Sequence, residues 1–297
     1  MRVAILGCGY VGLELGRQLR DDHEVVGVRR SPEGLDAIEA AGLEAVQADV
    51  TDRDSLAAVP DVDAVVFAAS SGGRGPGPAR AVYIEGQRTV VDEFAARERP
   101  PDRYVYTSST GVYGDHGGDW VDEQTEPTPD SERGEVLLAA ERVALEESTG
   151  AGIDGTVVRL AGIYGPDRYR IERYLDRPVV EGYRNIIHRD DAAGVVGFLL
   201  GEDVARDEVV LVADDEPTSR WAFADWLADA CGQTGPAKLT IEEYLAEYDV
   251  SAGRRRRLTS DKRCSNDRLR KLGYDLRYPT FRAGYREAIE RYCTGSE

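Results

Sequence analysis

The chain begins with an apolar run that turns on three closely spaced glycines, Val3-Ala4-Ile5-Leu6-Gly7-Cys8-Gly9-Tyr10-Val11-Gly12. A short, continuous apolar run is typical of a strand that is buried on both faces of a parallel sheet. Leucines at helical spacing follow over 13–19, and a second apolar run covers 25–28. Strand, glycine turn, helix and strand in this order are the fingerprint of a dinucleotide-binding unit.

Each glycine of this turn has its own physical task. Gly7 permits the tight turn, Gly9 lacks a Cβ so that the backbone can approach a pyrophosphate, and Gly12 allows close packing of helix on strand. The first turn of the helix also offers N–H groups and a partial positive charge to phosphates. We therefore predict that the whole turn binds the cofactor, through Gly7, Cys8, Gly9, Tyr10, Val11 and Gly12.

The second strand ends in Arg29 and Arg30, with no acidic residue at that point. An acidic side chain there binds the ribose 2′-hydroxyl of NAD, whereas a guanidinium suits the 2′-phosphate of NADP. The two arginines therefore predict NADP, with NAD less favoured. The alternative is that both are ordinary surface charges.

Apolar runs alternate with helical patterns over the first 160 residues. The predicted strands cover 3–6, 25–28, 43–48, 64–69, 104–107 and 156–160, and further helices cover 32–41, 54–59, 79–97 and 131–148. Loops are expected at 71–78 and 115–130. This alternation predicts an α/β fold, a Rossmann doubly wound parallel sheet with helices on both faces.

The pattern changes after residue 160, which suggests a second domain. We expect an NADP-binding Rossmann domain over 1–160, with a strand returning to it from about 185–215, and a smaller, predominantly substrate-binding domain over 161–297. In the second part we predict a turn at 162–166, helices at 171–175, 192–200, 219–231, 241–248, 266–272 and 281–292, and a strand at 209–212.

The charge balance excludes several classes of function. The formal net charge is −18, and only three lysines stand beside 34 arginines. Such an acidic chain resembles proteins adapted to salt and lacks the basic footprint of nucleic-acid binding. The four arginines at 254–257 are interpreted as a solvated or internally paired segment rather than a phosphate-binding patch. No run of 18 apolar residues exists, so neither a membrane span nor membrane binding is expected.

The cysteines are few and widely separated. Cys8, Cys231, Cys264 and Cys293 lack the spacing of a metal site, so no metal is expected. The apolar stretch at the start is too short and too broken for a signal peptide. We therefore expect reduced thiols in a cytoplasmic protein.

Taken together, the motifs resemble the extended short-chain dehydrogenase/reductase superfamily, the NAD-dependent epimerase/dehydratase group. They are the glycine turn, Asp49-Val50, Thr107-Ser108-Ser109 with Val112-Tyr113-Gly114, the stretch 159–166, Ile187-His188-Arg189-Asp190-Asp191 and Cys264-Ser265-Asn266. The resemblance covers nearly the whole chain. It implies reduction, epimerisation or dehydration of sugars and related alcohols or ketones.

The resemblance also implies where the rest of the cofactor lies. Asp49 and Val50 would flank the adenine ring, and Ala68, Ala69 and Ser70 would pass near the cofactor at the carboxyl edge of the sheet. Leu160 and Gly162 would cradle the nicotinamide. A homodimer through the helices near 81–97 and 135–147 is a further expectation from relatives.

The catalytic pair of this family, Tyr-x-x-x-Lys, is absent. With Glu141 as an anchor, Arg133 stands at the Tyr position and Leu137 at the Lys position, and no lysine occurs in the first 237 residues. The serine position survives as Ser109. Arg133 cannot donate a proton but remains able to bind a ribose, a phosphate or an anionic substrate. Leu137 can only pack.

If the chain is catalytic, its proton must come from elsewhere. The candidates are Tyr113, Tyr164, His116 or a water held by Ser109. Packing is the alternative role for both tyrosines, and a surface position is the alternative for His116. His188 is expected to be structural, and Asp190 is expected to cap the helix that starts near residue 192.

Three functions remain open. The first is an NADP-dependent oxidoreductase acting on a small polar carbonyl or a sugar-type substrate, with Ser109, Tyr113 and Arg133 as catalytic candidates. The second is a non-catalytic NADP-binding redox sensor, which the missing pair favours. The third is a nucleotide-sugar epimerase or dehydratase, which suffers more from losing the pair because its transient ketone also needs a base.

Overall fold

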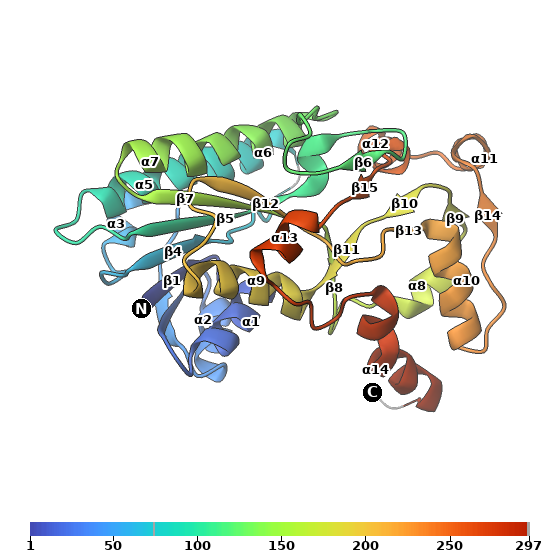
Figure 1. Cartoon of the computed structure of the whole chain (residues 1–297), viewed down its shortest axis with the longest axis horizontal. Coiled ribbons are helices and arrows are strands. Elements are labelled where there is room, and N and C mark those ends of the chain that lie inside the picture. Colours follow the sequence, from blue (N-terminus) through green and yellow to red (C-terminus); the bar gives the residue numbers. More distant parts are fainter. Residues whose placement is uncertain (74, 296–297) are drawn as a thin grey trace. The chain divides into compact units, whose positions relative to one another are not determined.

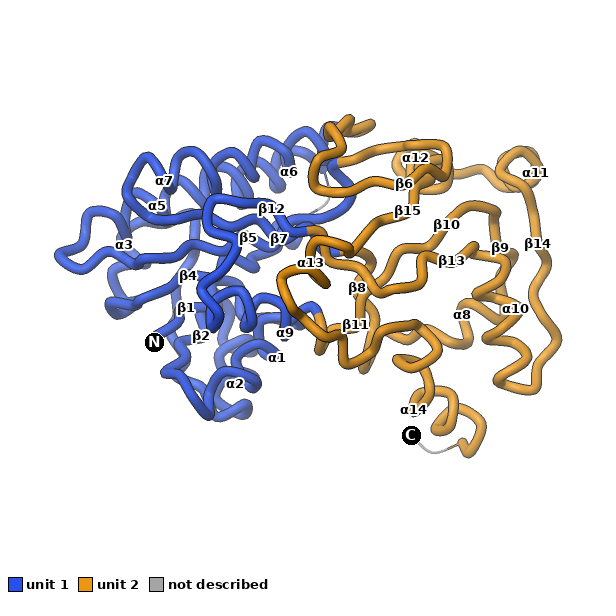
Figure 2. The backbone as a smooth tube through the Cα atoms, in the orientation of Figure 1, with its two compact units in different colours: residues 1–112, 132–160, 192–210 blue, residues 113–131, 161–191, 211–297 orange. Residues whose placement is uncertain are grey.

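The computed structural model describes residues 1–73 and 75–295. The chain divides into two compact units, coloured separately in Figure 2. The first unit comprises 1–112, 132–160 and 192–210, and the second comprises 113–131, 161–191 and 211–297. The predicted division at residue 160 marks the end of one segment of the first unit. The predicted loop at 115–130 belongs to the second unit.

The first unit is built on a seven-stranded sheet in the order β12-β7-β5-β4-β1-β2-β3. Its strands are β1 (Arg2–Leu6), β2 (Glu24–Arg29), β3 (Glu44–Gln47), β4 (Ala64–Phe67), β5 (Arg103–Ser109), β7 (Asp154–Leu160) and β12 (Glu208–Val212). The five neighbouring pairs from β7 to β3 are all parallel. The doubly wound parallel sheet is confirmed, and the predicted strands lie within two residues of the observed bounds.

Helices cover both faces of this sheet (Figure 1). One face carries α1 (Tyr10–Leu19), α2 (Pro32–Ala40) and α9 (Arg189–Gly201). The other carries α5 (Gln87–Ala95), α6 (Glu132–Arg142) and α7 (Ser148–Gly150), while the short α3 (Arg53–Leu56) lies beyond β3 in sequence. Buried side chains such as Phe67, Tyr104 and Phe94 fill the layer under the second face.

Two predicted helices of the first unit are interrupted. The helix expected at 79–97 begins earlier, as α4 (Pro76–Arg80), and passes through a π-helical segment, η1 (Ala81–Gly86), before α5. Thus the loop predicted at 71–78 is wrong from residue 76 onward, and its residue 74 lies outside the described residues. Proline at the first helical positions explains the early start. A second π-helical segment, η3 (Val143–Glu147), separates α6 from α7.

The second unit combines short strand pairs with helices. Its strands are β6 (Trp120–Val121), β8 (Gly162–Tyr164), β9 (Val179–Val180), β10 (Tyr183–Arg184), β11 (Ile186–His188), β13 (Thr218–Ser219), β14 (Lys238–Leu239) and β15 (Arg263–Cys264). Its helices are α8 (Ile171–Asp176), α10 (Arg220–Ala230), α11 (Ile241–Glu247), α12 (Ala252–Thr259), α13 (Asp267–Leu272) and α14 (Phe281–Thr294). Aromatic side chains dominate its core, where Tyr164 stacks on Tyr285 with 5.0 Å between the ring centroids.

Two local predictions for this unit are corrected, and the solvated or internally paired segment expected at 254–257 agrees with the structure. The expected turn at 162–166 contains β8, which pairs in parallel with β11, and both strands contain isoleucine, a residue that favours strands. The helix expected from residue 192 begins at Arg189, so Asp190 lies inside its first turn rather than at the cap. The arginines at 254–257 lie in α12, where Arg254 donates to the Tyr244 hydroxyl and the other three are exposed.

No helix among residues 1–73 and 75–295 is long and apolar enough to cross a membrane.

Candidate functional site

The glycine turn joins β1 to α1 within the first unit. Gly7 has φ +83°, and the N–H groups of Gly7 and Cys8 both donate to the Val28 carbonyl, at 3.0 and 3.1 Å. A Cβ on Gly7 would lie 2.2 Å from the Cα of Ala69. Positive φ and backbone contact together exclude any side chain here, so this position requires glycine.

The other two glycines open space for a ligand and for packing. A Cβ on Gly12 would lie 2.9 Å from Cγ2 of Ile5, which is the close helix–strand contact that the sequence predicted. Gly9 caps α1 without any side-chain hydrogen bond. The nearest atoms to a Cβ there would be Nη1 of Arg29, at 2.7 Å, and the Gly7 carbonyl oxygen, at 3.7 Å. Gly9 therefore keeps the N-terminus of α1 clear of a side chain of its own, which suits the approach of a pyrophosphate.

Cys8 lies inside this turn but has no reactive role. Its side chain is 1% exposed. Burial raises the pKa of the thiol to about 12, even though Arg29 and Arg17 oppose the shift. The thiol is therefore protonated at physiological pH and acts as a small apolar side chain.

The two arginines at the end of β2 take different positions. Arg29 runs across the start of α2, where its Nε lies 2.9 Å from the place a Cβ on Gly34 would occupy, and its Nη1 reaches the glycine turn. Arg30 is exposed and forms an ion pair with Asp49 at 3.8 Å. Its Nη2 lies 3.5 Å from a Cβ built on Gly72, in the loop after β4. Of the two, Arg30 has the freer guanidinium.

Asp49 is held in one orientation at the end of β3. Its Oδ1 accepts hydrogen bonds from the N–H and the hydroxyl of Thr51, at 3.0 and 2.8 Å. Partial burial opposes ionisation, but these hydrogen bonds and the Arg30 charge keep the pKa of Asp49 below its ordinary value. Val50 beside it is buried, against the position of Gly86. These residues form a fixed wall beside Arg30.

The carboxyl ends of three strands bring the remaining predicted residues of this unit to one edge. Ala68 donates its N–H to the Leu6 carbonyl at 2.8 Å, and Ala69 packs on Gly7, while Ser70 is exposed. Ser109 ends β5 and pairs in register with Leu160 at the end of β7. Its hydroxyl accepts the Gly111 N–H at 3.2 Å, which leaves the Ser109 proton available to a ligand.

A buried ion pair is hydrogen-bonded to the end of β5 at this edge. Arg159 on β7 and Glu141 on α6 make a bidentate contact, with Nη2–Oε2 2.7 Å and Nε–Oε1 3.0 Å. Both side chains are at most 5% exposed. Ser108 donates its hydroxyl to Glu141 Oε1 at 2.6 Å. The network fixes the residue next to Ser109, and nothing in the sequence indicated that these three residues meet.

Arg133 and Leu137, which replace the Tyr and Lys of the family, both lie on α6. Leu137 packs against the apolar core, and Arg133 is exposed at the start of α6. The Nη2 of Arg133 donates to the hydroxyl of Tyr83 at 2.9 Å, and its Nη1 lies 3.5 Å from Oγ of Ser71. Tyr83 was not among the predicted site residues, because helical periodicity does not show which side chain of a neighbouring helix it will meet.

The other predicted residues belong to the second unit. Gly162 is exposed in β8. Tyr113 is 0% exposed, and its hydroxyl donates to the Asp122 carbonyl at 2.6 Å. His116 is half-buried, with Nε2 2.9 Å from the Tyr113 carbonyl, and Tyr164 is buried in the aromatic core. These contacts favour packing over proton donation for Tyr113 and Tyr164.

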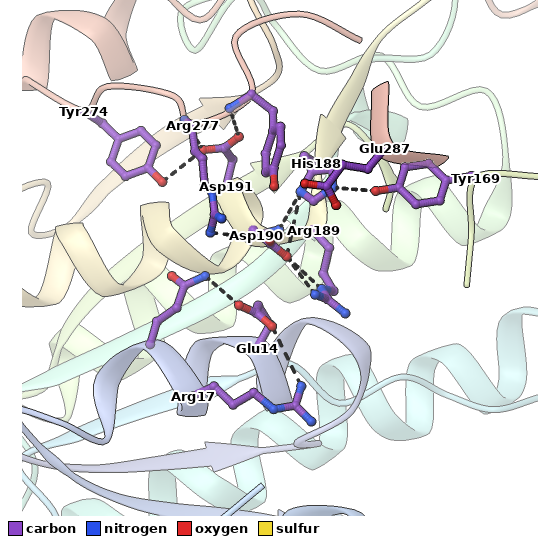
Figure 3. Close-up of polar contacts among 12 residues, drawn as sticks. Glu14, Arg17, Tyr169, His188, Arg189, Asp190, Asp191, Tyr274, Arg277 and Glu287 are labelled. Atoms are coloured by element: carbon purple, nitrogen blue, oxygen red, sulfur yellow. Dashed lines mark hydrogen bonds and ion pairs between the residues drawn. The ribbon is translucent and has the colours of Figure 1, made fainter. Parts of the chain in front are cut away.

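The motif at 187–191 forms a structural network, shown in Figure 3. Asp191 accepts the N–H groups of Arg277 and Tyr278 at 2.7 and 2.8 Å, together with the Tyr274 hydroxyl at 3.3 Å. Burial lowers the pKa of His188 to about 4 despite the opposing charge of Asp190. His188 is neutral at pH 7 and contacts the Tyr169 hydroxyl, in agreement with the structural role predicted for it.

Comparison with known proteins decides the family. A model of the NAD(P)H-binding family matches residues 7–203, about two thirds of the chain. The chain belongs to the NAD(P)H-binding family. The match includes the glycine turn, both arginines, Ser109 and α6, and it confirms the predicted cofactor class at the level of NAD(P).

Several relatives align with this chain over nearly its whole length. Protein YeeZ of Escherichia coli K12 is 28% identical over 286 residues, covering 94% of this chain and 96% of that one. A structure of a functionally unknown conserved protein from Silicibacter pomeroyi is 28% identical with TM-score 0.78, covering 100% and 99%. UDP-glucose 4-epimerase of Thermotoga maritima, 17% identical over 100% of both chains, has TM-score 0.81 and shares the fold.

These matches confirm the resemblance to the epimerase/dehydratase group, whose fold this chain shares. The cofactor-binding part of the site therefore matches the family, whereas the catalytic position differs from it. The glycine turn, its helix N-terminus and the carboxyl edge fit a dinucleotide. The position of the Tyr-x-x-x-Lys pair holds a guanidinium and an apolar side chain instead.

Proposed function

We propose that this protein is an NADP-dependent oxidoreductase that reduces a small polar carbonyl or a sugar-type substrate. The proposal rests on the glycine turn at the N-terminus of α1, where Gly9 has no side chain, together with the exposed guanidinium of Arg30 just after β2. The preference for NADP rests on Arg30, since its guanidinium can grip a 2′-phosphate bidentately. Asp49 lies 3.8 Å from Nη1 of that guanidinium and forms an ion pair with it.

The nicotinamide end of the cofactor, where the reaction takes place, would lie at the carboxyl edge of the sheet. NADPH supplies a hydride when it is bound. Ser109 donates a hydrogen bond to the carbonyl oxygen, because the Gly111 N–H already occupies one lone pair of the Ser109 hydroxyl and fixes its orientation. This hydrogen bond polarises the carbonyl and holds it for attack.

Cofactor preference gives the first test. Arg30→Ala is expected to weaken NADP binding about tenfold to a hundredfold, the effect of one charge-assisted bidentate contact, and to leave NAD binding unchanged. Isothermal titration with both nucleotides measures the two affinities. Arg291→Ala, which removes an exposed arginine on α14, is the matched control. A wild-type chain that prefers NAD contradicts the assignment of NADP.

Turnover gives the second test. The wild-type chain should oxidise NADPH in the presence of at least one member of a panel of small aldehydes, ketones and keto sugars. Ser109→Ala is expected to lower kcat about a hundredfold with little change in NADP affinity, because one hydrogen bond to the developing oxyanion is lost. Turnover that survives Ser109→Ala unchanged excludes Ser109 from the reaction.

The absence of the catalytic pair favours a second candidate, a redox sensor that binds NADP without turning it over. The sensor predicts tight NADP binding, no NADPH oxidation across the same panel and a co-purifying partner protein. The oxidoreductase predicts turnover that depends on Ser109. The same purified protein therefore separates the two.

A further inference from the structure

The hydroxyl of Tyr83 is hydrogen-bonded to the guanidinium of Arg133. It accepts a hydrogen bond from Nη2 of Arg133 at 2.9 Å and the N–H of Ser71 at 3.4 Å. The guanidinium carbon lies 5.4 Å from the centre of the Tyr83 ring. These two donors occupy both lone pairs of the phenol oxygen. The hydroxyl can therefore act towards a ligand only as a hydrogen-bond or proton donor.

Packing fixes the position of this phenol. The ring is 7% exposed and belongs to the apolar core of the first unit. Tyr83 lies in the π-helical segment η1, a departure from regular helix that is frequent at functional sites. The side chain of Gln87 donates to the carbonyls of Tyr83 and Ala140, at 2.6 and 3.3 Å, and so ties η1 to α6.

The hydroxyl end lies at the carboxyl edge of the sheet. Ser71, its N–H donor, follows β4 directly after the cofactor-edge residues. β4 and β5 are neighbouring parallel strands, so the segment after β4 and the end of β5 leave the sheet at the same edge. The Tyr83 hydroxyl contacts that segment at Ser71, and Ser109 ends β5, at the edge where a ligand of such a sheet binds.

We propose that Tyr83 is the proton donor of this enzyme, replacing the tyrosine that α6 lacks. The inference rests on the proposed oxidoreductase function. The carbonyl carbon accepts a hydride from NADPH, its C–O π bond breaks, and the oxygen takes the proton of Tyr83 Oη. The electron pair of the O–H bond stays on Oη, which then recovers a proton from water, and NADP⁺ and the alcohol leave.

Arg133 acts through Tyr83 as a positioning residue. Its guanidinium is always charged and cannot give up a proton, but it stabilises the phenolate oxygen by charge and by a hydrogen bond. The family places phenol and cation on one helix, a turn apart. Here the cation is on α6 and the phenol on η1, so the pair is assembled across two helices.

The decisive variant is Tyr83→Phe, which keeps the packed ring and removes only the hydroxyl. It is expected to lower kcat about a hundredfold or more, the typical contribution of a general acid, without changing NADP affinity. The matched control is Tyr244→Phe. Tyr244 is a buried tyrosine on α11 of the second unit, and its hydroxyl is hydrogen-bonded to an arginine, Arg254, as that of Tyr83 is to Arg133. Tyr244→Phe should keep wild-type kcat.

Arg133 provides a second measurement that a merely structural role would not move. Arg133→Lys retains a positive N–H donor, whereas Arg133→Met removes charge and donor while keeping the aliphatic volume. Arg133→Met is expected to lower kcat at least about tenfold, and Arg133→Lys to restore most of the loss. Equal kcat in the two variants overturns the positioning role.

A readout without turnover completes the test. In protein labelled with [¹³Cζ]tyrosine, the resonance that is missing from Tyr83→Phe belongs to Tyr83. It should shift when NADP⁺ is added, because the nicotinamide end then lies beside the hydroxyl. A resonance that does not respond to NADP⁺, or a Tyr83→Phe chain that keeps wild-type kcat, overturns the proposal for Tyr83 and leaves the oxidoreductase standing. A wild-type chain that reduces no carbonyl overturns both.

Discussion

Gly9→Ala is expected to weaken NADP binding about a hundredfold, or ~2.7 kcal/mol, while the chain folds as before. The new methyl group stands at the N-terminus of α1, so the pyrophosphate is held away from the backbone N–H groups and loses charge-assisted hydrogen bonds. The fold tolerates the change because the one close contact of the methyl is with Nη1 of Arg29, the far end of a flexible side chain. Nucleotide titration and thermal unfolding measure the two effects separately.

Two other glycines bracket this result. Gly7→Ala should destabilise the fold itself, since its Cβ would meet the Ala69 backbone at 2.2 Å and the position has φ +83°. Gly150→Ala, at a position in α7 with open space around it, should change neither property. If Gly9→Ala binds NADP like the wild type, the turn is not the pyrophosphate site.

The fold of the first unit was predictable because its signals are local. Each buried strand is a continuous apolar run, as at 64–67, and each glycine of the turn has a role that backbone geometry alone determines. The π-helical segments and the early start of α4 were missed. The prolines at 76 and 78 account for the early start but were read as part of a loop, whereas the π-helical segments depend on packing between helices, about which periodicity within one helix carries no information.

The candidate site was predictable only in part, for the same physical reason. The sequence identified Arg29 and Arg30 together, but only the structure separates them, since Arg29 lies along α2 and Arg30 faces Asp49. Tyr83 carries no motif, and its relevance appears only once Arg133 is placed beside it. Short strands such as β8 were read as turns because their pairing partner, β11, is more than twenty residues away.

Arg159→Met is expected to destabilise the protein by about 3–5 kcal/mol, a large part of the stability of a typical domain. The variant removes the guanidinium that pairs with Glu141, whose side chain is 3% exposed, and keeps the hydrogen bond from the Ser108 hydroxyl. The double variant Arg159→Met with Glu141→Leu should recover most of the loss, because an apolar pair of similar volume leaves no buried charge. Chemical denaturation of the three chains measures the effect.

The exposed pair Arg88–Glu147 makes this test specific to burial. It has the same bidentate chemistry and the same 2.7 Å contact, but its side chains are 45% and 42% exposed. Arg88→Met should therefore cost less than about 1 kcal/mol. Because Ser108 links the buried pair to the strand end that carries Ser109, Arg159→Met should also lower turnover in the fraction that remains folded. An Arg159→Met chain as stable as Arg88→Met would show that the buried pair does not hold this edge of the sheet.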